Sequence, residues 1–280
     1  MKSMQPSKKW QDYICLPEQD WSLMDMAFMV AEQLQDESDL SLSKDLLAQF
    51  MLTLKERVKG ANSAAEQLER VNDYLFNELG FSSNQDDYFN ADNSLINLVL
   101  TTRTGIPLTL SLLYLEMLSS LGMECNGINF PGHFLVGVKI SGHYQIHDAF
   151  REGILLEKNE IKKMLTHHQI GINCDEELAD YLKPASHRQV IIRLLRNLKN
   201  IYIEQQDEER SLQVIEMILS LEPVSSDEIR DRGMVYHYLD YTEGALIDLT
   251  AYLELEPNSH DRTIIEALIE SLHEQSTPLH

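Results

Sequence analysis

The sequence predicts an α+β fold in two parts: an N-terminal helical bundle that leads into a small antiparallel sheet, and an all-α region built from repeats. Three observations support this prediction. Apolar residues recur at helical spacing between residues 23 and 79. A mostly apolar helix and three strand-like runs follow one another between residues 107 and 150. Beyond residue 187 the sequence repeats itself.

Length and composition bound the possible functions. The chain has 280 residues, 43% hydrophobic and 24% charged, which excludes a wholly disordered protein. At ~150 residues per domain, about two domains are expected. With 23 Lys and Arg against 45 Asp and Glu, the net charge is −22. Phosphate backbones and anionic lipids would repel this charge, so we expect no nucleic acid and no membrane as partner.

The cysteines indicate a reducing compartment. Cys15, Cys125 and Cys174 are too few and too far apart for a disulfide scaffold or a zinc ribbon. The N-terminus lacks the apolar core of a signal peptide, and no run reaches the ~18 apolar residues of a membrane span. We therefore expect a cytoplasmic protein with no cofactor and no metal.

The first third of the chain predicts three amphipathic helices, over residues 23–34, 43–58 and 63–79. Ser22 is the expected N-cap of the first, with Asp25 three residues later. Residues 81–92 are rich in Asn, Asp and Ser and predict a loop. Its aspartates lack EF-hand spacing, so a solvated loop is favoured over a calcium site.

The stretch from residue 93 to 157 is the most informative. A short helix over 93–103 ends at a turn, and Pro107 suits the first position of a buried helix that Gly122 ends. Three strand-like runs follow, separated by Pro-Gly and Ser-Gly turn signals, at 125–130, 133–140 and 144–150. The segment predicts a buried helix followed by a three-stranded antiparallel meander.

Two residues of this meander could carry chemistry. The turn at 141–142 can bring His133, at the start of one strand, opposite Asp148 on the next. A carboxylate beside an imidazole orients the ring and supports its protonated form, as in the second half of a nucleophile–His–Asp system. The first half would need a nucleophile at a helix N-terminus, where the dipole favours a thiolate.

This order of elements resembles the transglutaminase-like superfamily, which has a papain-like core with Cys at a helix start, then His and Asp on successive strands. His133 and Asp148 match the His and Asp of that family. In the family the helix ends at a Gly about fifteen residues after the nucleophile, and counting back from Gly122 leads to Pro107. The resemblance therefore implies that the nucleophilic Cys is lost, which argues against an enzyme.

The motifs GIP at 105–107, PGHF at 131–134 and HDAF at 147–150 narrow the resemblance. These motifs and the stretch 76–118 are similar to the SirB family. The resemblance covers about residues 20–275. This bacterial family joins a transglutaminase-like domain to C-terminal tetratricopeptide repeats, and its biochemical function is not established. The resemblance implies a fold more than an activity.

Other polar residues lie near the GIP turn. Arg103 could pair with a carboxylate at the edge of the site, and Thr109 could supply a hydroxyl there. The structural alternatives are a surface arginine and a hydroxyl bonded to the preceding turn. For His133 and Asp148 the alternative is a hydrogen-bonded pair in the core without a catalytic role.

The C-terminal region carries an internal repeat. The segment 211–223 ends at Pro223, and the similar segment 245–257 ends at Pro257, 34 residues later. A helix–turn–helix period of 34 matches tetratricopeptide repeats. Pro184 marks the expected boundary, so we predict a helical and transglutaminase-like domain over 1–184, and two repeats with a capping helix over 185–280.

Three functions remain open. The favoured one is a protein-binding or regulatory module whose acidic repeats bind a basic or polar peptide surface. The alternative is a hydrolase or acyl-transfer enzyme acting on amide bonds, with His133 as base, Asp148 as its partner and water as nucleophile. A purely structural or regulatory protein is the third possibility.

Overall fold

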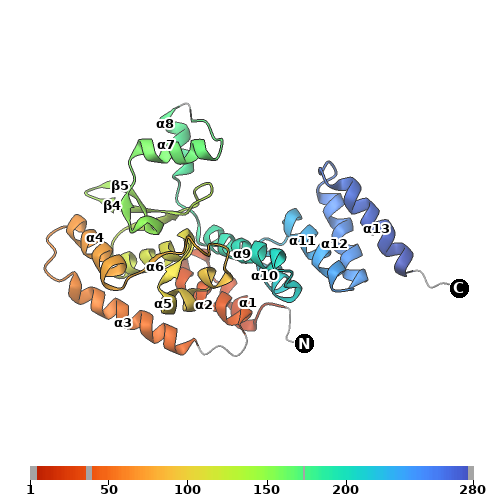
Figure 1. Cartoon of the computed structure of the whole chain (residues 1–280), viewed down its shortest axis with the longest axis horizontal. Helices are drawn as coiled ribbons and strands as arrows, with labels where there is room; N and C mark the ends of the chain where they lie inside the picture. The colour runs from red at the N-terminus through yellow and green to blue at the C-terminus, as the bar shows by residue number, and fades with distance from the viewer. Residues whose placement is uncertain (1–4, 36–39, 173, 277–280) are drawn as a thin grey trace. The chain divides into compact units, whose positions relative to one another are not determined.

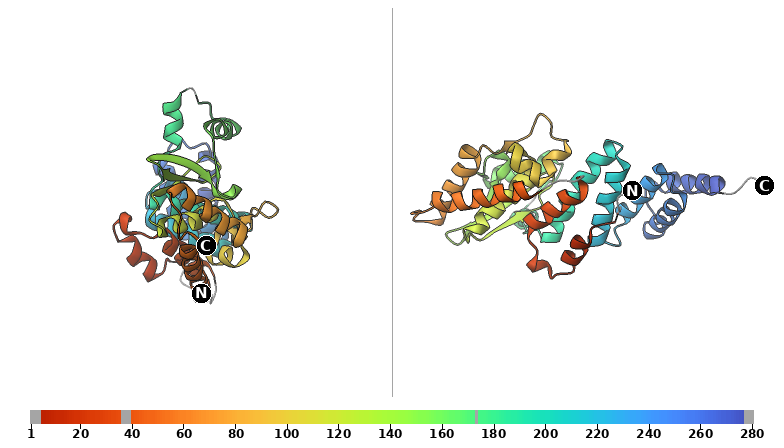
Figure 2. Two further views of the ribbon diagram at one scale, coloured as in Figure 1. Left: turned by 90° about the vertical axis from the view of Figure 1, so that its left-hand side faces the viewer. Right: turned by 90° about the horizontal axis from the view of Figure 1, so that it is seen from below.

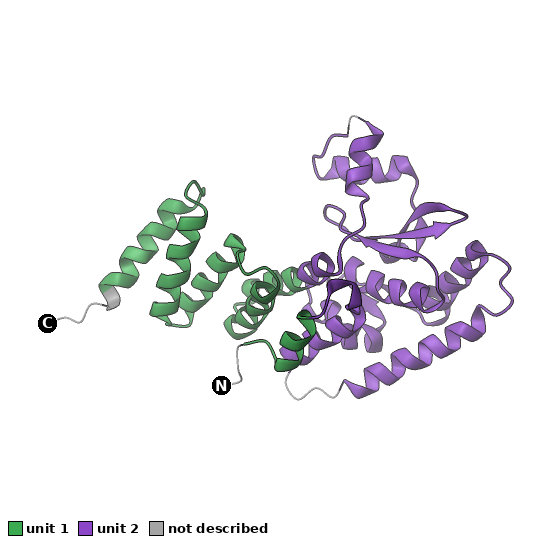
Figure 3. Ribbon diagram, turned by 180° about the vertical axis from the view of Figure 1, so that it is seen from behind, with its two compact units in different colours: residues 1–15, 195–280 green, residues 16–194 purple. Residues whose placement is uncertain are grey.

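The computed structural model describes residues 5–35, 40–172 and 174–276. Helices dominate and the sheets are small, so the α+β prediction is confirmed (Figure 1). The chain divides into two compact units (Figure 3). One comprises residues 16–194, and the other comprises residues 1–15 and 195–280. The division falls inside helix α9 (His187–Glu204), and the domain boundary at Pro184 stays a prediction.

Helices form one layer of the unit that spans residues 16–194. Serine side chains cap two of them as local sequence suggests, because Ser22 accepts a hydrogen bond from the Asp25 amide and Ser63 accepts one from the Glu66 amide. The predicted helix 63–79 changes to a π-helical turn over Asp73–Glu78. The main helices are α2 (Leu23–Leu34), α3 (Ser41–Arg57), α4 (Ala64–Asn72), α5 (Ile96–Thr102) and α6 (Pro107–Ser120).

Helix α6 lies at the centre of this unit. It starts at Pro107 and is buried along nearly its whole length, as its apolar sequence predicts. It packs against α2, α3, α4 and α5 and against the main sheet. Gly122 follows its end with a φ of 72°, a left-handed conformation that suits glycine.

The main sheet is an antiparallel meander in sequence order. Its strands are β3 (Cys125–Ile128), β4 (Leu135–Ile140), β5 (His143–Asp148) and β6 (Ile154–Leu155). The register pairs Val136 with His147. Two differences from the prediction are the added strand β6 and the later start of β4, which leaves His133 in the preceding turn.

The structure contains a second, smaller sheet that the sequence does not predict. Strands β1 (Ser82–Ser83) and β2 (Thr104–Gly105) pair in parallel, and each is two residues long. Strands this short carry no alternating pattern that a sequence could reveal. They join the start of the predicted loop 81–92 to the turn before α6. The rest of the loop is turns, and it ends in the 3-10 helix η3 (Ala91–Ser94).

Two helices follow the sheet. They are α7 (Lys158–His167) and α8 (Asp175–Tyr181), and their apolar residues form one cluster with the sheet. Ile161 and Leu165 of α7 contact this cluster together with Leu135 of β4. The cluster contains Phe130, which directly precedes the turn that carries His133. The helices therefore support that turn from one side.

The other unit contains the repeats, in the helices α10 (Glu208–Leu221), α11 (Ser226–Tyr238), α12 (Thr242–Leu255) and α13 (Arg262–Ser276). Successive helices from α10 to α13 contact one another (Figure 2). Helices α10 and α12 start and end 34 residues apart. The turns before them share a left-handed residue, Gln206 at φ 56° and Asp240 at φ 55°. The repeat seen in the sequence is therefore a repeat of structure.

A short N-terminal helix completes this unit. Helix α1 (Lys8–Ile14) places Trp10 against the repeats, where its side chain is fully buried. The Trp10 indole N–H donates to Ser220 Oγ of α10 over 2.8 Å. From the sequence, this segment is expected in the first domain. Its long-range contact depends on a residue more than 200 positions away, which no local pattern could indicate.

None of the helices within residues 5–35, 40–172 and 174–276 is long and apolar enough to cross a membrane.

Candidate functional site

The candidate site is centred on a histidine–aspartate pair. His133 lies in the turn between β3 and β4, and Asp148 is the last residue of β5. The antiparallel pairing of β4 and β5 brings them together, with His133 Nε2 2.8 Å from Asp148 Oδ1. The side chain of Asp148 is 1% exposed and that of His133 is 15% exposed. One edge of the imidazole therefore reaches the surface while the carboxylate lies in the interior.

The carboxylate of Asp148 is fixed from two directions. Its Oδ1 also accepts a hydrogen bond from the Phe150 amide at 3.0 Å, which ends strand β5 and starts the 3-10 turn η4 (Ala149–Arg151). Its Oδ2 is buried and has no hydrogen-bond partner among the described residues. A buried oxygen without a partner is costly, and such groups are often kept for a function.

The bond to Asp148 orients the imidazole of His133. It uses Nε2, and within the described chain Nδ1 has no hydrogen-bond partner. Nδ1 is therefore the nitrogen that could accept a proton from a water molecule. This arrangement can hold a base in place. Because no nucleophilic side chain bonds to it, the pair by itself supplies only half of a catalytic system.

A chain of aromatic rings begins next to His133. The Phe150 ring meets the His133 ring edge-on at 5.9 Å between centroids, and the Tyr88 ring meets Phe150 at 6.2 Å. Burial raises the pKa of Tyr88, which keeps its hydroxyl neutral. The neighbouring Phe89 is 70% exposed. These rings could not be predicted as part of the site, because the composition of residues 81–92 indicates only a polar loop.

Arg193 supports the turn that carries His133. Its guanidinium donates to the Phe130 carbonyl over 2.9 Å and lies 5.8 Å from the Phe134 ring. These two residues lie on either side of the turn, and the His133 amide itself bonds to the Phe130 carbonyl. Burial lowers the pKa of Arg193, although arginine stays charged. Arg193 was not among the residues that the sequence singled out.

Pro107 and Thr109 both serve the start of α6. Pro107 occupies its first position and is buried. The Thr109 hydroxyl donates to the Asn93 carbonyl over 2.7 Å and accepts from the Ile106 amide over 3.2 Å. Thr109 is fully buried, so its hydroxyl is committed to the helix start and is not free for a ligand.

Arg103 lies in a different environment from the expected one. It ends α5 in a left-handed conformation with a φ of 64°. Its guanidinium stacks on the Phe50 and Phe81 rings, at 4.4 and 5.1 Å from their centroids, and donates to the Leu79 carbonyl. No carboxylate pairs with it in the part of the chain that the structure describes. Arg103 therefore joins α3 to the end of the π-helical turn through cation–π contacts.

Within the described residues, none of the cysteines forms a hydrogen bond with His133 or Asp148. Cys125 is half-buried, with its sulfur 3.4 Å from Ser119 Oγ, and burial raises the pKa of its thiol. A raised pKa reduces the thiolate that would attack a substrate. Cys15 and Cys174 are exposed and have no described partner. Over the described ranges, no three His, Cys, Asp or Glu side chains are grouped so that they could hold a metal ion.

A second candidate surface lies on the repeats. All six Lys and Arg side chains from residue 195 to 274 form ion pairs with carboxylates of the same unit. Arg232 bonds to both oxygens of Asp248, and although burial works against it, this pairing raises the pKa of Arg232. Lys199 is 7% exposed and bonds to Glu228, which is 1% exposed. The lysines and arginines of this region are therefore paired with carboxylates of their own unit.

The acidic side chains are in excess over these cations. Eight carboxylates between residues 195 and 274 have no described hydrogen-bond or ion-pair partner: Glu204, Glu208, Glu209, Asp240, Glu243, Glu254, Glu270 and Glu274. All of them are exposed or partly exposed. The surface of the repeats is thus negative, with no free lysine or arginine among those residues to offset it.

Comparison with known proteins agrees with both halves of the structure. Residues 42–196 match the transglutaminase-like superfamily, and residues 198–270 match the tetratricopeptide repeat. A protein of Xylella fastidiosa named UPF0162 protein is 31% identical over 97% of both chains. Protein SirB1 of Salmonella typhimurium is 25% identical, covering 92% of this chain and 95% of its own.

A eukaryotic protein shares part of the sequence. F-box only protein 21 of Mus musculus is 37% identical over 112 residues, which is 37% of this chain and 18% of that protein.

Proposed function

The chain belongs to the SirB family of transglutaminase-like proteins with tetratricopeptide repeats, and we propose that it is a protein-binding module whose repeats recognise a basic segment of a partner. The observation that carries this proposal is the charge of the repeats. Between residues 195 and 274 the lysines and arginines are bound internally, while eight exposed or partly exposed carboxylates have no partner among the described residues.

The repeats suit this role for two physical reasons. Tetratricopeptide arrays offer an extended surface made of stacked helices, and they generally bind other proteins. A surface of one sign attracts a partner of opposite sign and speeds its association. A basic peptide segment is therefore the partner that this surface favours, and salt should weaken its binding.

The transglutaminase-like domain supports a role without cysteine chemistry. Family resemblance puts the nucleophile at the start of α6, and Pro107 stands there. Proline has no group that could attack a carbonyl. The described cysteines lie elsewhere, and the one near the sheet is a half-buried thiol.

A second candidate function rests on His133. Its Nδ1 has no hydrogen-bond partner within the described chain while Asp148 holds Nε2, which is the geometry of an oriented base. The domain could then hydrolyse an amide bond with water as nucleophile. This candidate predicts measurable turnover of an amide substrate by the wild-type protein and its loss in His133→Ala. Equal rates in both proteins would exclude it.

The binding proposal is tested with the whole chain and a labelled lysine-rich peptide. Affinity is measured by fluorescence polarisation at low and at high salt, with a glutamate-rich peptide of the same length as the control. We expect the lysine-rich peptide to bind and to lose about tenfold or more in affinity at high salt. The glutamate-rich peptide should not bind.

Paired charge reversals locate the interaction. The test variant is Glu204→Lys with Glu243→Lys, two unpaired carboxylates of the repeats. The matched control is Glu69→Lys with Asp86→Lys, two exposed carboxylates of the other unit. The proposal requires that the first variant weaken binding more than the second. Equal effects would show that only the net charge matters, and the repeats would not be the binding surface.

A further inference from the structure

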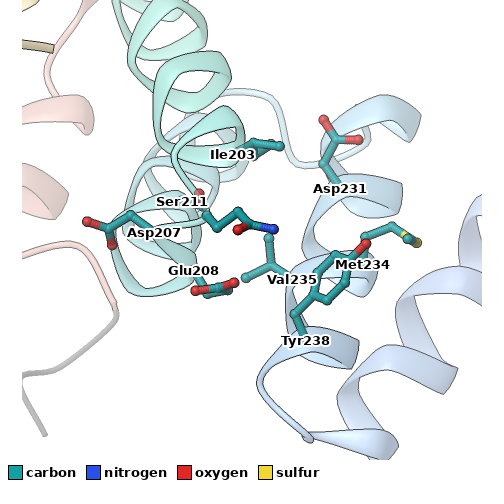
Figure 4. A pocket seen from close by; sticks show the side chains of 9 residues that line it. Ile203, Asp207, Glu208, Ser211, Asp231, Met234, Val235 and Tyr238 are labelled. Carbon is teal, nitrogen blue, oxygen red and sulfur yellow. The ribbon is translucent and has the colours of Figure 1, made fainter. Parts of the chain in front are cut away.

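A pocket opens on the repeats where the end of α9, the start of α10 and one face of α11 meet (Figure 4). Its volume is about 280 Å³. It lies entirely within the unit that contains residues 195–280. The lining residues are Ile203, Gln206, Asp207, Glu208, Ser211, Asp231, Met234, Val235 and Tyr238.

The lining combines two kinds of side chain. Ile203, Met234 and Tyr238 offer apolar surface, and Tyr238 is largely exposed. Glu208 on α10 and Asp231 on α11 add carboxylates, and Figure 4 shows Glu208 on the opposite side of the pocket from Met234. Apolar walls that end in carboxylates match a side chain with an aliphatic stem and a cationic head.

The hydroxyl of Ser211 is an independent sign of a ligand. Ser211 lines the pocket, yet it is only 1% exposed. Its Oγ is buried and has no hydrogen-bond partner among the described residues. A buried hydroxyl without a partner costs free energy, and a polar group that enters the pocket would satisfy it.

The carboxylates of the pocket differ in their availability. Asp207 caps α10 and pairs with Arg210, so its charge is offset. Asp231 bonds to Lys199 and to Arg230, and both cations share further carboxylates. Glu208 has no partner in the described structure. A cation that enters the pocket can therefore pair with Glu208 without breaking an existing bond.

The network behind Asp231 also leaves a negative field. It contains three cations, Arg196, Lys199 and Arg230, and it joins them to five carboxylates: Glu222, Asp227, Glu228, Asp231 and Asp261. The cations next to the pocket are thus more than balanced. An incoming anionic side chain would be repelled, and a cationic one attracted.

We propose that this pocket binds one lysine or arginine side chain of the partner, with the stem against Met234 and Tyr238, the charge at Glu208 and a donor to Ser211 Oγ. The proposal rests on the proposed function, because it names the part of the basic segment that the repeats read. It assigns the specificity of the surface to one buried contact. The remaining carboxylates contribute attraction over a longer range.

The probes are three small molecules: the N-acetyl methylamides of lysine, arginine and norleucine. Norleucine keeps the aliphatic stem and lacks the charge. The full chain is labelled at its Ile, Met and Val methyl groups, so that Ile203, Met234 and Val235 report from inside the pocket by NMR. We expect the lysine or the arginine derivative to shift these three methyl signals in a saturable way, and the norleucine derivative to leave them in place. The stronger of the two cations identifies the preferred side chain.

Three variants separate the contributions. Glu208→Gln is expected to weaken binding of the preferred cation by about tenfold, since a charged hydrogen bond is lost. Ser211→Ala should weaken binding while leaving thermal stability unchanged or raised, because the unpartnered hydroxyl is removed. Glu254→Gln removes a carboxylate of the repeats that does not line the pocket, and it should have little effect.

The outcomes are distinguishable from those of the peptide experiment. If neither cationic derivative produces a saturable shift up to about 50 mM, the pocket proposal is wrong, even where the lysine-rich peptide binds with salt dependence. It is also wrong if Glu208→Gln and Glu254→Gln weaken binding equally. If the derivatives bind in the pocket and the lysine-rich peptide does not bind, the pocket stands and the proposed function fails.

Discussion

His133 Nε2 lies 2.8 Å from Asp148 Oδ1, a contact made at the open end of the β4–β5 hairpin, where His133 precedes β4 and Asp148 ends β5. The hairpin register sets this distance, and the Phe150 amide holds the same carboxylate oxygen. Helix α6, whose first residue is Pro107, packs against the same sheet. The pair therefore links the turn before β4 to the end of β5, whatever chemistry it performs.

His133→Ala should destabilise the domain, because it leaves the carboxylate of Asp148 buried without its imidazole partner. We expect the free energy of unfolding to fall by about 1–3 kcal/mol. Urea unfolding, followed by the fluorescence of Trp21 in a Trp10→Phe background, measures this loss.

The control is Asp148→Asn in the same background. The amide oxygen of asparagine can still accept from the Phe150 amide, and the buried charge is gone. Adding Asp148→Asn to His133→Ala should therefore recover part of the lost stability. A double variant that is as unstable as the sum of the two single variants would contradict an interaction between the pair.

His147 predicts a pH-dependent stability. Its ring is buried beside β6 and lacks a partner at Nε2 among the described residues, while Nδ1 bonds to the Gly153 carbonyl at 3.0 Å. Burial lowers the pKa of His147 below its ordinary value of 6.5, since the charged form is poorly solvated there. The unfolded chain therefore binds this proton more readily than the folded one.

The stability from neutral His147 is fully present above pH 6.5 and falls as the pH drops towards the lowered pKa. Thermal unfolding at about pH 7.5 and about pH 5.5 measures this change. In His147→Gln, which keeps an N–H donor for the Gly153 carbonyl, the difference between the two pH values should be smaller. An unchanged difference would assign the pH dependence to other groups.

The buried ion pair of Lys199 and Glu228 predicts a stability effect in the repeats. Glu228→Ala removes a carboxylate that bonds to both Lys199 and Arg196. Because Lys199 would stay buried with only Asp231, we expect a loss of about 3 kcal/mol in the free energy of unfolding. The fluorescence of Trp10, which packs on α10, reports on this unit in a Trp21→Phe background.

An exposed ion pair provides the matched control. Arg262 and Glu266 lie one turn apart on α13, with side chains 42% and 45% exposed. Glu266→Ala should cost less than about 1 kcal/mol, since solvent screens such pairs. If the two substitutions had equal effects, burial of the Lys199–Glu228 pair would not determine its contribution.

The cysteines predict an order of alkylation. Cys125 is half-buried with a raised pKa, whereas Cys15 and Cys174 are exposed. At about pH 8, iodoacetamide should modify the two exposed cysteines first, because the thiolate is the reactive form. Mass spectrometry of the digested protein over time measures the order. Fast modification of Cys125 would reveal an activated thiol and would favour the enzymatic alternative.

Local sequence determined the elements of this protein. Ser22 and Ser63 cap helices because their hydroxyls reach amides within the same turn. Turn signals at 131–132 and 141–142 separate the strands of the sheet. A 34-residue period placed α10 and α12 in equivalent positions, down to the left-handed residue before each. These features depend on neighbours a few positions apart, and a sequence records them directly.

Tertiary structure decided which side chains meet. Arg103 stacks on two phenylalanine rings rather than pairing with a carboxylate. The Thr109 hydroxyl donates to the Asn93 carbonyl at the start of α6, and the Trp10 indole donates to Ser220 Oγ. The proximity of His133 and Asp148 could be predicted from the sequence because a single hairpin joins them. Contacts between separate elements depend on how whole surfaces pack, and residue spacing carries no record of that packing.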